Sequence, residues 1–562
     1  MVEKYISDKP VVKILFEICL SYGVEHVIIS PGSRNAPLII SFPGCGQFKC
    51  LSITDERSAG YFALGLAKST QHPVIIACTS GTAALNYSPA VAEAYYQRVP
   101  LIVITADRPS EWINQADGQT IGQDGIYRNF IRFECRLPED IYYQDDEWHV
   151  NRMLNEAFQK AEKTPGPVHI NIPFREPLYG KTAYIPEHIR KIEFTPKANY
   201  LPENEMDLMI DEINRYEKVM VLIGSETPNE VLQNALSLMA LKNVVVMVET
   251  LSNLNDKLFI NCTDRIVSTF SEEEYSMFSP ELLITFDGQV LSRMIKKVLR
   301  NAKPKHHWHI TNDETIVDTY LSLTRIVKID AAWLIPVIES KMNIKSSAYI
   351  DTWQKRALHS MNNHNDFISN IPWCDLNVFK ILSSIQIPSE QVHLGNSTPV
   401  RYAQLFDWKG KHEWFANRGT SGIDGCVGVA AGFAFGSGKS TLLITGDLSF
   451  LYDTNGLWHN YLPETFRIIV INNGGGGIFR FIQGPVETNE LETFFETNKP
   501  INCEGIAQTF GIDYTACKNE NEFLASIETF FDNTGKPRLM ELFTPNIENG
   551  IILKQYFDNL KK

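Results

Sequence analysis

The sequence predicts an α/β protein built from three doubly wound parallel-sheet domains. Short runs rich in β-branched residues alternate with longer stretches of helical periodicity, the pattern of parallel sheets covered on both faces by helices. The chain of 562 residues is too long for one core, because domains typically contain about 100 to 200 residues. A hydrophobic content of 44% with 21% charged residues is ordinary for a globular protein.

The first domain is expected at residues 1–185. Asp8 and Pro10 are start signals for a helix at about 9–22, and Gly23 is its stop signal. The strands expected after this helix lie at 26–30, 74–79, 101–106 and 168–173. Helical segments separate them, as a parallel sheet requires.

A central α/β domain is expected at 186–345 and a third domain at 346–562. The central strands are expected at 219–225, 244–249, 282–286 and 307–311. A polar helical connector at 346–366 precedes the third domain, whose strands are expected at 392–394, 442–445 and 468–472.

Composition and charge disfavour several classes of partner. A net charge of −14 disfavours nucleic acid, because nonspecific binding to a phosphate backbone needs clustered Lys and Arg. No apolar run approaches the roughly 20 residues that span a bilayer, and the first residues lack the apolar segment of a secretory signal. Ten cysteines are scattered without a CxxC pair, which is typical of a reducing compartment. We therefore expect a cytoplasmic protein without membrane or nucleic-acid partners.

Polar side chains follow two strands of the third domain. Gly446 and Asp447 come directly after the strand at 441–445, and Asn473 follows the next apolar strand, at 467–471. Alone, a Gly-Asp pair after a strand usually forms only a turn. The carboxyl ends of adjacent parallel strands, however, open into the crevice where ligands bind. One carboxylate and one amide oxygen could therefore reach a single cation, and such ligands suit Mg²⁺.

An acidic pair and two arginines mark the first domain. Asp55 and Glu56 begin an apolar helix, where acidic residues most often serve as caps that complement the helix dipole. Arg34 and Arg108 each follow a predicted strand, at 26–30 and 101–106. Each arginine alone could be a surface cation. Several converging on one crevice would make a site for carboxylates, which a planar guanidinium can engage bidentately.

Other patterns are weaker. Residues 436–440 resemble the end of a phosphate loop, but Phe433 stands where its first Gly is required and the segment precedes its strand. Residues 474–477 could cradle an anion or simply form a tight loop with positive φ. His306 and His307 alternate across a strand, which disfavours a zinc site. The chain has no GxGxxG motif of a nucleotide-binding oxidoreductase.

The Gly-Asp pair with a double Asn about 26 positions later resembles the diphosphate-binding motif of thiamine diphosphate enzymes. The resemblance implies that Asp447, the Asn473 side chain and the Gly475 carbonyl bind Mg²⁺ or Mn²⁺. Three further residues would lie beside the diphosphate: Gly446, Leu448 and Ser449. Many relatives carry a second Gly at the position of Leu448.

The same resemblance assigns the other half of the cofactor to the first domain. Glu56 would hydrogen-bond the aminopyrimidine, and Ile423 would be the apolar wedge that bends the cofactor. A carboxyl in an apolar pocket suits this contact, because desolvation favours its protonated form. The pyrimidine and diphosphate halves would come from two subunits of a homodimer or homotetramer.

Over nearly its full length the chain closely resembles the 2-succinyl-5-enolpyruvyl-6-hydroxy-3-cyclohexene-1-carboxylate synthase family of menaquinone biosynthesis. The matching segments lie at 30–34, 55–57, 79–83, 105–109, 395–397, 417–425 and 446–449. The resemblance implies a transferase that decarboxylates 2-oxoglutarate and adds the remaining succinyl-semialdehyde unit to isochorismate by 1,4-addition.

The resemblance also implies a set of substrate-binding residues. Those expected to contact carboxylates or hydroxyls are Ser33, Arg34, Arg108, Gln119, Arg293, Ser397, Arg401 and Arg418. Ile478 and Phe479 would form an apolar wall. The chain departs from some relatives at Gly118, where they have Asn, and at Ser292, where Lys can occur.

Two alternatives remain open at this point. Another thiamine diphosphate enzyme, an acetolactate synthase or a 2-oxo acid decarboxylase, would share the cofactor motif, but the number of arginines disfavours a small neutral acceptor. A non-catalytic ligand-binding paralogue would keep the fold, but intact Glu56, Asp447 and Asn473 disfavour it.

Overall fold

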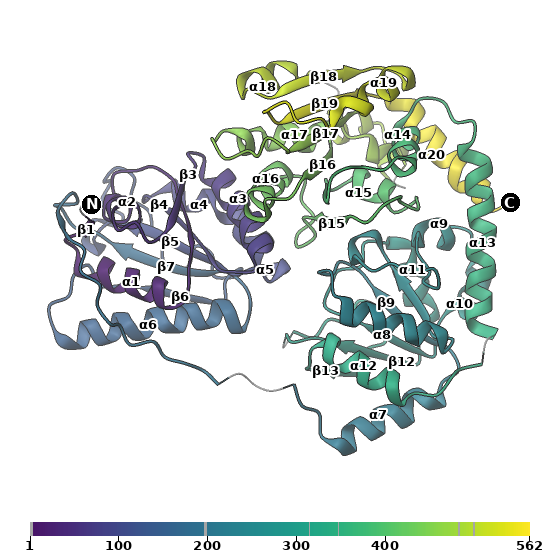
Figure 1. Cartoon of the computed structure of the whole chain (residues 1–562), viewed down its shortest axis with the longest axis horizontal. Helices are drawn as coiled ribbons and strands as arrows, with labels where there is room; N and C mark the ends of the chain where they lie inside the picture. Colours follow the sequence, from purple (N-terminus) through teal and green to yellow (C-terminus); the bar gives the residue numbers. More distant parts are fainter. Residues whose placement is uncertain (1–3, 196–198, 314, 347, 482–483, 498–500) are drawn as a thin grey trace.

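The computed structural model describes residues 4–195, 199–313, 315–346, 348–481, 484–497 and 501–562. Three parallel sheets with helices on both faces form the molecule, together with a small antiparallel pair, β1 (Tyr5–Ser7) and β8 (Lys181–Ala183). The three sheets are arranged around an open ring in Figure 1. The predicted fold class is therefore confirmed.

The first sheet has the strand order β3-β2-β4-β5-β7-β6. Its strands are β2 His26–Ile29, β3 Lys49–Ser52, β4 Val74–Cys78, β5 Leu101–Asp107, β6 Phe133–Arg136 and β7 Val168–Pro173. Its helices are α1 Pro10–Ser21, α2 Ala36–Gly44, α3 Glu56–Thr70, α4 Thr82–Asn86, α5 Ser88–Gln97 and α6 Gln144–Lys163. α1, α2 and α6 cover one face, and α3 and α5 cover the other. Pro10 occupies the first turn of α1, where the helix was predicted to begin.

The second sheet has the order β10-β9-β11-β12-β13. Its strands are β9 Val219–Ile223, β10 Val245–Val248, β11 Leu282–Thr285, β12 His306–Ile310 and β13 Arg325–Val327. Its helices are α7 Glu203–Arg215, α8 Glu230–Leu241, α9 Thr263–Val267, α10 Tyr275–Phe278, α11 Arg293–Ala302 and α12 Ala331–Lys341. His307 and His309 both lie against the Thr285 hydroxyl at 2.7 and 2.9 Å, so these rings belong to a buried polar network of the sheet.

The third sheet has the order β15-β14-β16-β17-β19-β18. Its strands are β14 Gln391–Leu394, β15 Glu413–Ala416, β16 Thr441–Gly446, β17 Arg467–Asn472, β18 Asp513–Cys517 and β19 Arg538–Phe543. Its helices are α13 Ala348–Ile368, α14 Asp375–Ser384, α15 Thr398–Ala403, α16 Cys426–Ser437, α17 Asp447–Tyr452, α18 Glu504–Thr509, α19 Glu520–Phe530 and α20 Asn546–Leu560. The segment resembling a phosphate loop is the end of α16, where Gly438 is a left-handed C-cap.

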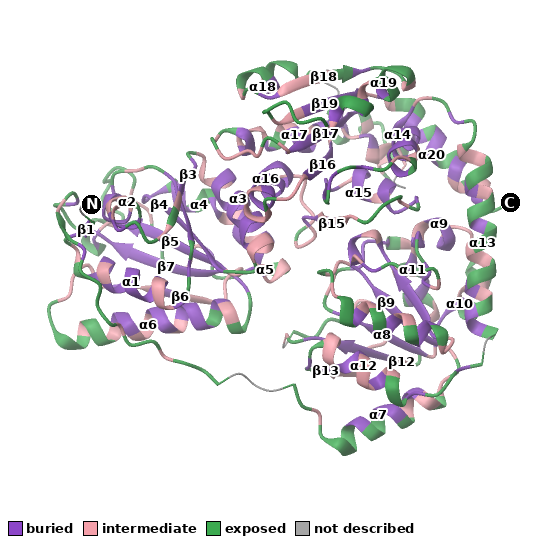
Figure 2. Ribbon diagram, viewed as in Figure 1, coloured by how far each residue is buried: buried purple, intermediate pink, exposed green. Residues whose placement is uncertain are grey.

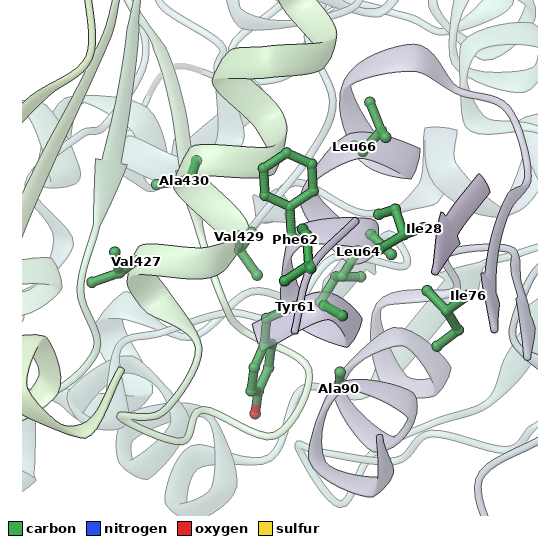
Figure 3. Packing of buried hydrophobic residues seen from close by; sticks show 14 of the residues in the cluster. Ile28, Tyr61, Phe62, Leu64, Leu66, Ile76, Ala90, Val427, Val429 and Ala430 are labelled. Atoms are coloured by element: carbon green, nitrogen blue, oxygen red, sulfur yellow. The ribbon is translucent and has the colours of Figure 1, made fainter. Parts of the chain in front are cut away.

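The first and third sheets share one core. α3 crosses α16 so closely that a Cβ on Gly65 would lie 2.0 Å from the Val429 carbonyl oxygen. A Cβ on Gly432 would lie 2.0 Å from the Phe62 carbonyl oxygen, so both crossing positions require glycine. Figure 3 shows Phe62 and Leu64 of α3 beside Val429 and Ala430 of α16 in this core. The crossing fixes the first sheet against the third within one chain.

The sheet interiors are buried throughout, while the outer faces of the helices are exposed (Figure 2). Helix α13, the predicted connector, runs along the second sheet to α20 of the third, and the Tyr349 hydroxyl donates to the Phe278 carbonyl at 2.8 Å. All ten cysteines are free thiols. Within the described ranges no helix is long and apolar enough to cross a membrane.

Candidate active site

The predicted cation ligands meet at the carboxyl edge of the third sheet. β16 and β17 are neighbours, with Gly446 opposite Ile471, so Asp447 and Asn473 emerge side by side from adjacent strand ends. Both side chains are buried. One carboxylate oxygen of Asp447 accepts a hydrogen bond from the Leu448 amide at 2.7 Å.

The electrostatics of Asp447 fit a cation. Its side chain is 5% exposed, and burial, together with the neighbouring carboxylate of Asp375, raises its pKa to about 6. No Lys or Arg in the part of the chain that the structure describes lies within 4.0 Å of the Asp447 carboxylate. The Asn473 amide nitrogen donates to Asp375 at 2.9 Å, which leaves the amide oxygen as a free ligand. A buried carboxylate without a cationic partner, next to a free amide oxygen, suits Mg²⁺ or Mn²⁺.

The surrounding loops have the shape that this role requires. The Ser449 hydroxyl donates to the Ile423 carbonyl at 2.6 Å, which ties the predicted wedge to the start of α17. Gly475 has φ 97°, and a Cβ there would lie 2.3 Å from the Thr497 carbonyl oxygen, so only glycine fits. The described residues hold no group of three or more His, Cys, Asp or Glu placed to bind a metal. The predicted donors are instead one carboxylate, one amide and one carbonyl.

Glu56 lies in the first turn of α3 but is not its N-cap. Asp55 is the N-cap of α3 and accepts from the Ser58 amide at 3.1 Å. Glu56 is half-buried, and burial raises the pKa of its carboxyl, with a smaller contribution from Asp55. After burial, the charge of Glu56 is the next cause that raises the pKa of Cys78, at the carboxyl end of β4. The side chain is therefore a partly desolvated acid near the edge of the first sheet.

Arg34 and Arg108 line one cavity of about 310 Å³ at that edge. The cavity is lined by Arg34, Arg108, Pro109, Trp112, Asp117, Arg175 and Glu176. Arg34 donates to the Phe174 carbonyl at 2.9 Å, which fixes its guanidinium. Gln119, in the left-handed region with φ 55°, lies against the same loops next to Gly81. Ser33 precedes α2, and its carbonyl accepts from the Ala36 amide.

Three other predicted arginines gather where the second and third sheets meet. Burial, together with the charges of Arg418 and Arg293, lowers the pKa of Arg401 to about 10. Arg418 donates to the Asn396 side chain at 2.8 Å, and Arg401 donates to the Ser397 carbonyl. Among the described residues no carboxylate lies within 4.0 Å of any of the three guanidinium groups. Asp264, Glu249 and Glu93 act on the cluster only from beyond ion-pair distance, and like charges that gather without a direct ion pair suit an anionic ligand.

Ile478 and Phe479 lie in a 3-10 helix, Gly477–Arg480, directly after the Asn473 loop. Phe479 packs on Phe495 with ring centroids 5.5 Å apart. In one chain, the predicted site residues therefore fall into two groups. The carboxyl edge of the first sheet carries Ser33, Arg34, Glu56, Arg108 and Gln119, and the third sheet with α11 carries all the others.

Two family models and several known proteins match the chain. The model of the N-terminal binding domain of thiamine pyrophosphate (thiamine diphosphate) enzymes matches residues 10–126, and the model of their C-terminal binding domain matches 395–542. A 2-succinyl-5-enolpyruvyl-6-hydroxy-3-cyclohexene-1-carboxylate synthase of Flavobacterium psychrophilum is 40% identical over 98% of this chain and 99% of its own. The synthase of the same name from Porphyromonas gingivalis is 40% identical, over 98% of this chain and 97% of its own. The synthase of the same name from Bacteroides thetaiotaomicron is 36% identical over 99% of this chain and 100% of its own.

The chain belongs to the 2-succinyl-5-enolpyruvyl-6-hydroxy-3-cyclohexene-1-carboxylate synthase family. It is thus a thiamine diphosphate-dependent enzyme, as the sequence motifs predicted. The matched segments contain Glu56 at one end and Asp447 with Asn473 at the other.

In this member of the synthase family, the structure places one further cationic side chain, Lys296, near the arginine cluster, and the sequence did not predict it. Lys296 lies one turn after Arg293 on α11, which places both on one helix face. Burial lowers the pKa of Lys296, Glu249 opposes this shift, and the charges of Arg418 and Arg293 add to it. Ser292, at a position where Lys can occur in relatives, is the N-cap of α11 and accepts from the Ile295 amide at 3.1 Å. The signal that could have found Lys296 is its spacing from Arg293.

Proposed function

We propose that this enzyme decarboxylates 2-oxoglutarate and joins the succinyl-semialdehyde unit to the ring alkene of isochorismate by 1,4-addition. The product would be 2-succinyl-5-enolpyruvyl-6-hydroxy-3-cyclohexene-1-carboxylate. The observation that carries the proposal is the cluster of Arg293, Arg401 and Arg418, which forms no ion pair within 4.0 Å in the described ranges and lies in a member of this synthase family. A small neutral acceptor would not need such a cluster.

The residues of the chain would bind and orient the reactants. Asp447, Asn473 and the Gly475 carbonyl would hold the divalent cation. Glu56 would stay protonated and donate a hydrogen bond to the pyrimidine ring nitrogen. Bound thiamine diphosphate supplies the electron sink for decarboxylation. The arginines would bind the carboxylates of both substrates and offset the repulsion between them, which is a contribution of positioning and electrostatics. Ile478 and Phe479 would exclude water from the reacting carbons.

The complete site would lie between two protomers of a homodimer or homotetramer. In support, the described residues that line the cavity at Arg34 and Arg108 all lie between 34 and 176. In the dimer, the carboxyl edge of the first sheet of one protomer would face the carboxyl edge of the third sheet, with Asp447, of the other protomer. The division of labour would then follow the predicted domains, with 1–185 binding the pyrimidine, 346–562 binding the diphosphate and 186–345 contributing α11. The free thiols support a location in the reducing cytoplasm.

The test is incubation with thiamine diphosphate, Mg²⁺, 2-oxoglutarate and isochorismate, followed by mass spectrometry. We expect the adduct of isochorismate with 2-oxoglutarate less CO₂. Pyruvate in place of 2-oxoglutarate serves as the control, and its efficient use would favour an acetolactate synthase. Decarboxylation of 2-oxoglutarate without any adduct would contradict the proposal.

A further inference from the structure

A second buried carboxylate stands behind the predicted cation site. Asp375, the first residue of α14, is 2% exposed and accepts from the Asn473 amide nitrogen at 2.9 Å. Its other oxygen accepts from the Thr544 hydroxyl at 2.6 Å, and its backbone amide donates to the Asn549 side chain at 2.8 Å. No sequence motif singles out this residue.

These contacts determine which end of the Asn473 side chain faces Asp447. A carboxylate offers only acceptors, so the amide nitrogen must point to Asp375 and the amide oxygen must point away from it. The Asn473 backbone is also held, because the Asn546 side chain donates to its carbonyl at 2.9 Å. Asp375 therefore selects the amide orientation that can bind a cation.

The Asp375 carboxylate forms no ion pair with the described residues. Among the residues that the structure places, no Lys or Arg comes within 4.0 Å of its carboxylate. The amino-terminal end of α14 and the neutral side chains of Thr544, Asn473 and Asn549 stabilise it without supplying a positive charge. A buried carboxylate normally pairs with a cation, and the nearest predicted cation site is that of Asp447 and Asn473.

We propose that Asp375 is a positioning residue of the metal site, which orients the Asn473 amide and adds a second negative charge behind the divalent cation. This inference rests on the proposed roles of Asp447 and Asn473 in metal binding. It needs no direct contact between Asp375 and the metal.

The test measures Mn²⁺ binding to the full-length protein with thiamine diphosphate, by the electron paramagnetic resonance signal of free Mn²⁺. Removing a group that orients a ligand typically weakens metal binding about 10- to 100-fold. We expect a loss in this range for Asp375→Ala. Asp375→Asn keeps an acceptor for Asn473 but not the charge, so we expect a smaller loss, of about 3- to 10-fold.

The matched control is Glu520→Gln. Glu520 accepts a hydrogen bond at 3.2 Å from the side chain of Asn377, which lies on α14 as Asp375 does. The control should bind Mn²⁺ within about twofold of wild type.

Thermal unfolding of the metal-free proteins separates positioning from general support of the fold. Removing an unpaired buried charge should leave the midpoint of Asp375→Asn equal to or above that of wild type, although its Mn²⁺ affinity falls. If Asp375→Ala does not fold, Asp375→Asn carries the test alone. Wild-type Mn²⁺ affinity in Asp375→Asn, or a loss of affinity only in parallel with a lower midpoint, would overturn the inference. If Asp447→Asn also retained Mn²⁺ binding, the proposed metal site itself would be wrong.

Discussion

The Asp447→Asn variant should be more stable than wild type without cofactor and less stable with it. In the folded protein the pKa of Asp447 is raised from 3.8 to about 6 by burial. One pKa unit corresponds to about 1.4 kcal/mol, so the ionised carboxylate costs the metal-free protein about 3 kcal/mol at neutral pH. Asparagine removes this cost but also one carboxylate oxygen that can accept backbone hydrogen bonds such as that from the Leu448 amide, a loss of about 1 kcal/mol. The net gain should be about 1 to 2 kcal/mol.

The assay is thermal unfolding in EDTA and again with saturating Mg²⁺ and thiamine diphosphate. A unit of about 200 residues shifts by about 2–4 °C per kcal/mol, so in EDTA at pH 7.5 we expect Asp447→Asn to unfold a few degrees above wild type. Because the pKa is raised in the folded state, the difference should shrink as the pH falls through about 6 and vanish below the ordinary pKa of Asp. Cofactor and Mg²⁺ should raise the midpoint of wild type only. Equal stabilisation of both proteins by the cofactor would refute the reasoning.

Three further predictions concern the rest of the site and the fold. Glu56→Gln should bind thiamine diphosphate but slow the exchange of its C2 proton by at least about 100-fold, as followed by NMR in deuterium oxide; unchanged exchange would remove Glu56 from this role. Lys296→Gln should raise the KM of one carboxylate substrate about tenfold with little change in kcat, since a charge-assisted contact is worth about 1.5 kcal/mol or more; an unaltered KM would place Lys296 outside the site. Gly65→Ala should destabilise the protein by about 1 to 3 kcal/mol in urea denaturation, because its Cβ would meet the Val429 carbonyl, whereas Gly505→Ala, with open space around it, should not; equal effects would contradict the close crossing.

The sequence predicted the interior of the sheets better than their edges. Buried apolar runs such as β4, β9 and β16 were placed within a residue or two because both faces are covered. Among the edge strands, β3, β6, β13, β15 and β18 are short and include exposed or polar positions, so they lack that signal, whereas the fully buried edge strand β10 was predicted. β19 was missed although it is central, because Arg538 and Glu541 interrupt its apolar run. Glu541 is fully buried and is held by the side chains of Asn472 and Tyr514.

The site shows the same division between local and distant information. Asp447 and Asn473 were found because each follows its own strand in a recognisable motif. Asp375 was not, because its role depends on Asn473 and Thr544, which are 98 and 169 residues away in the chain. Lys296 has a local signal, its spacing from Arg293. That spacing alone does not predict a site, because only the folded structure shows that α11 packs near Arg418.

The most direct test of the central claim mixes two inactive variants. We propose that Glu56 of one protomer and Asp447 of another serve the same cofactor molecule. Glu56→Gln and Asp447→Asn, unfolded and refolded together, should then regain about a quarter of wild-type activity, because half of the random dimers are mixed and each has one intact site of two. Each variant refolded alone should stay inactive. If the mixture stayed inactive while refolded wild type recovered its activity, Glu56 and Asp447 would act within one chain, and the account would be wrong.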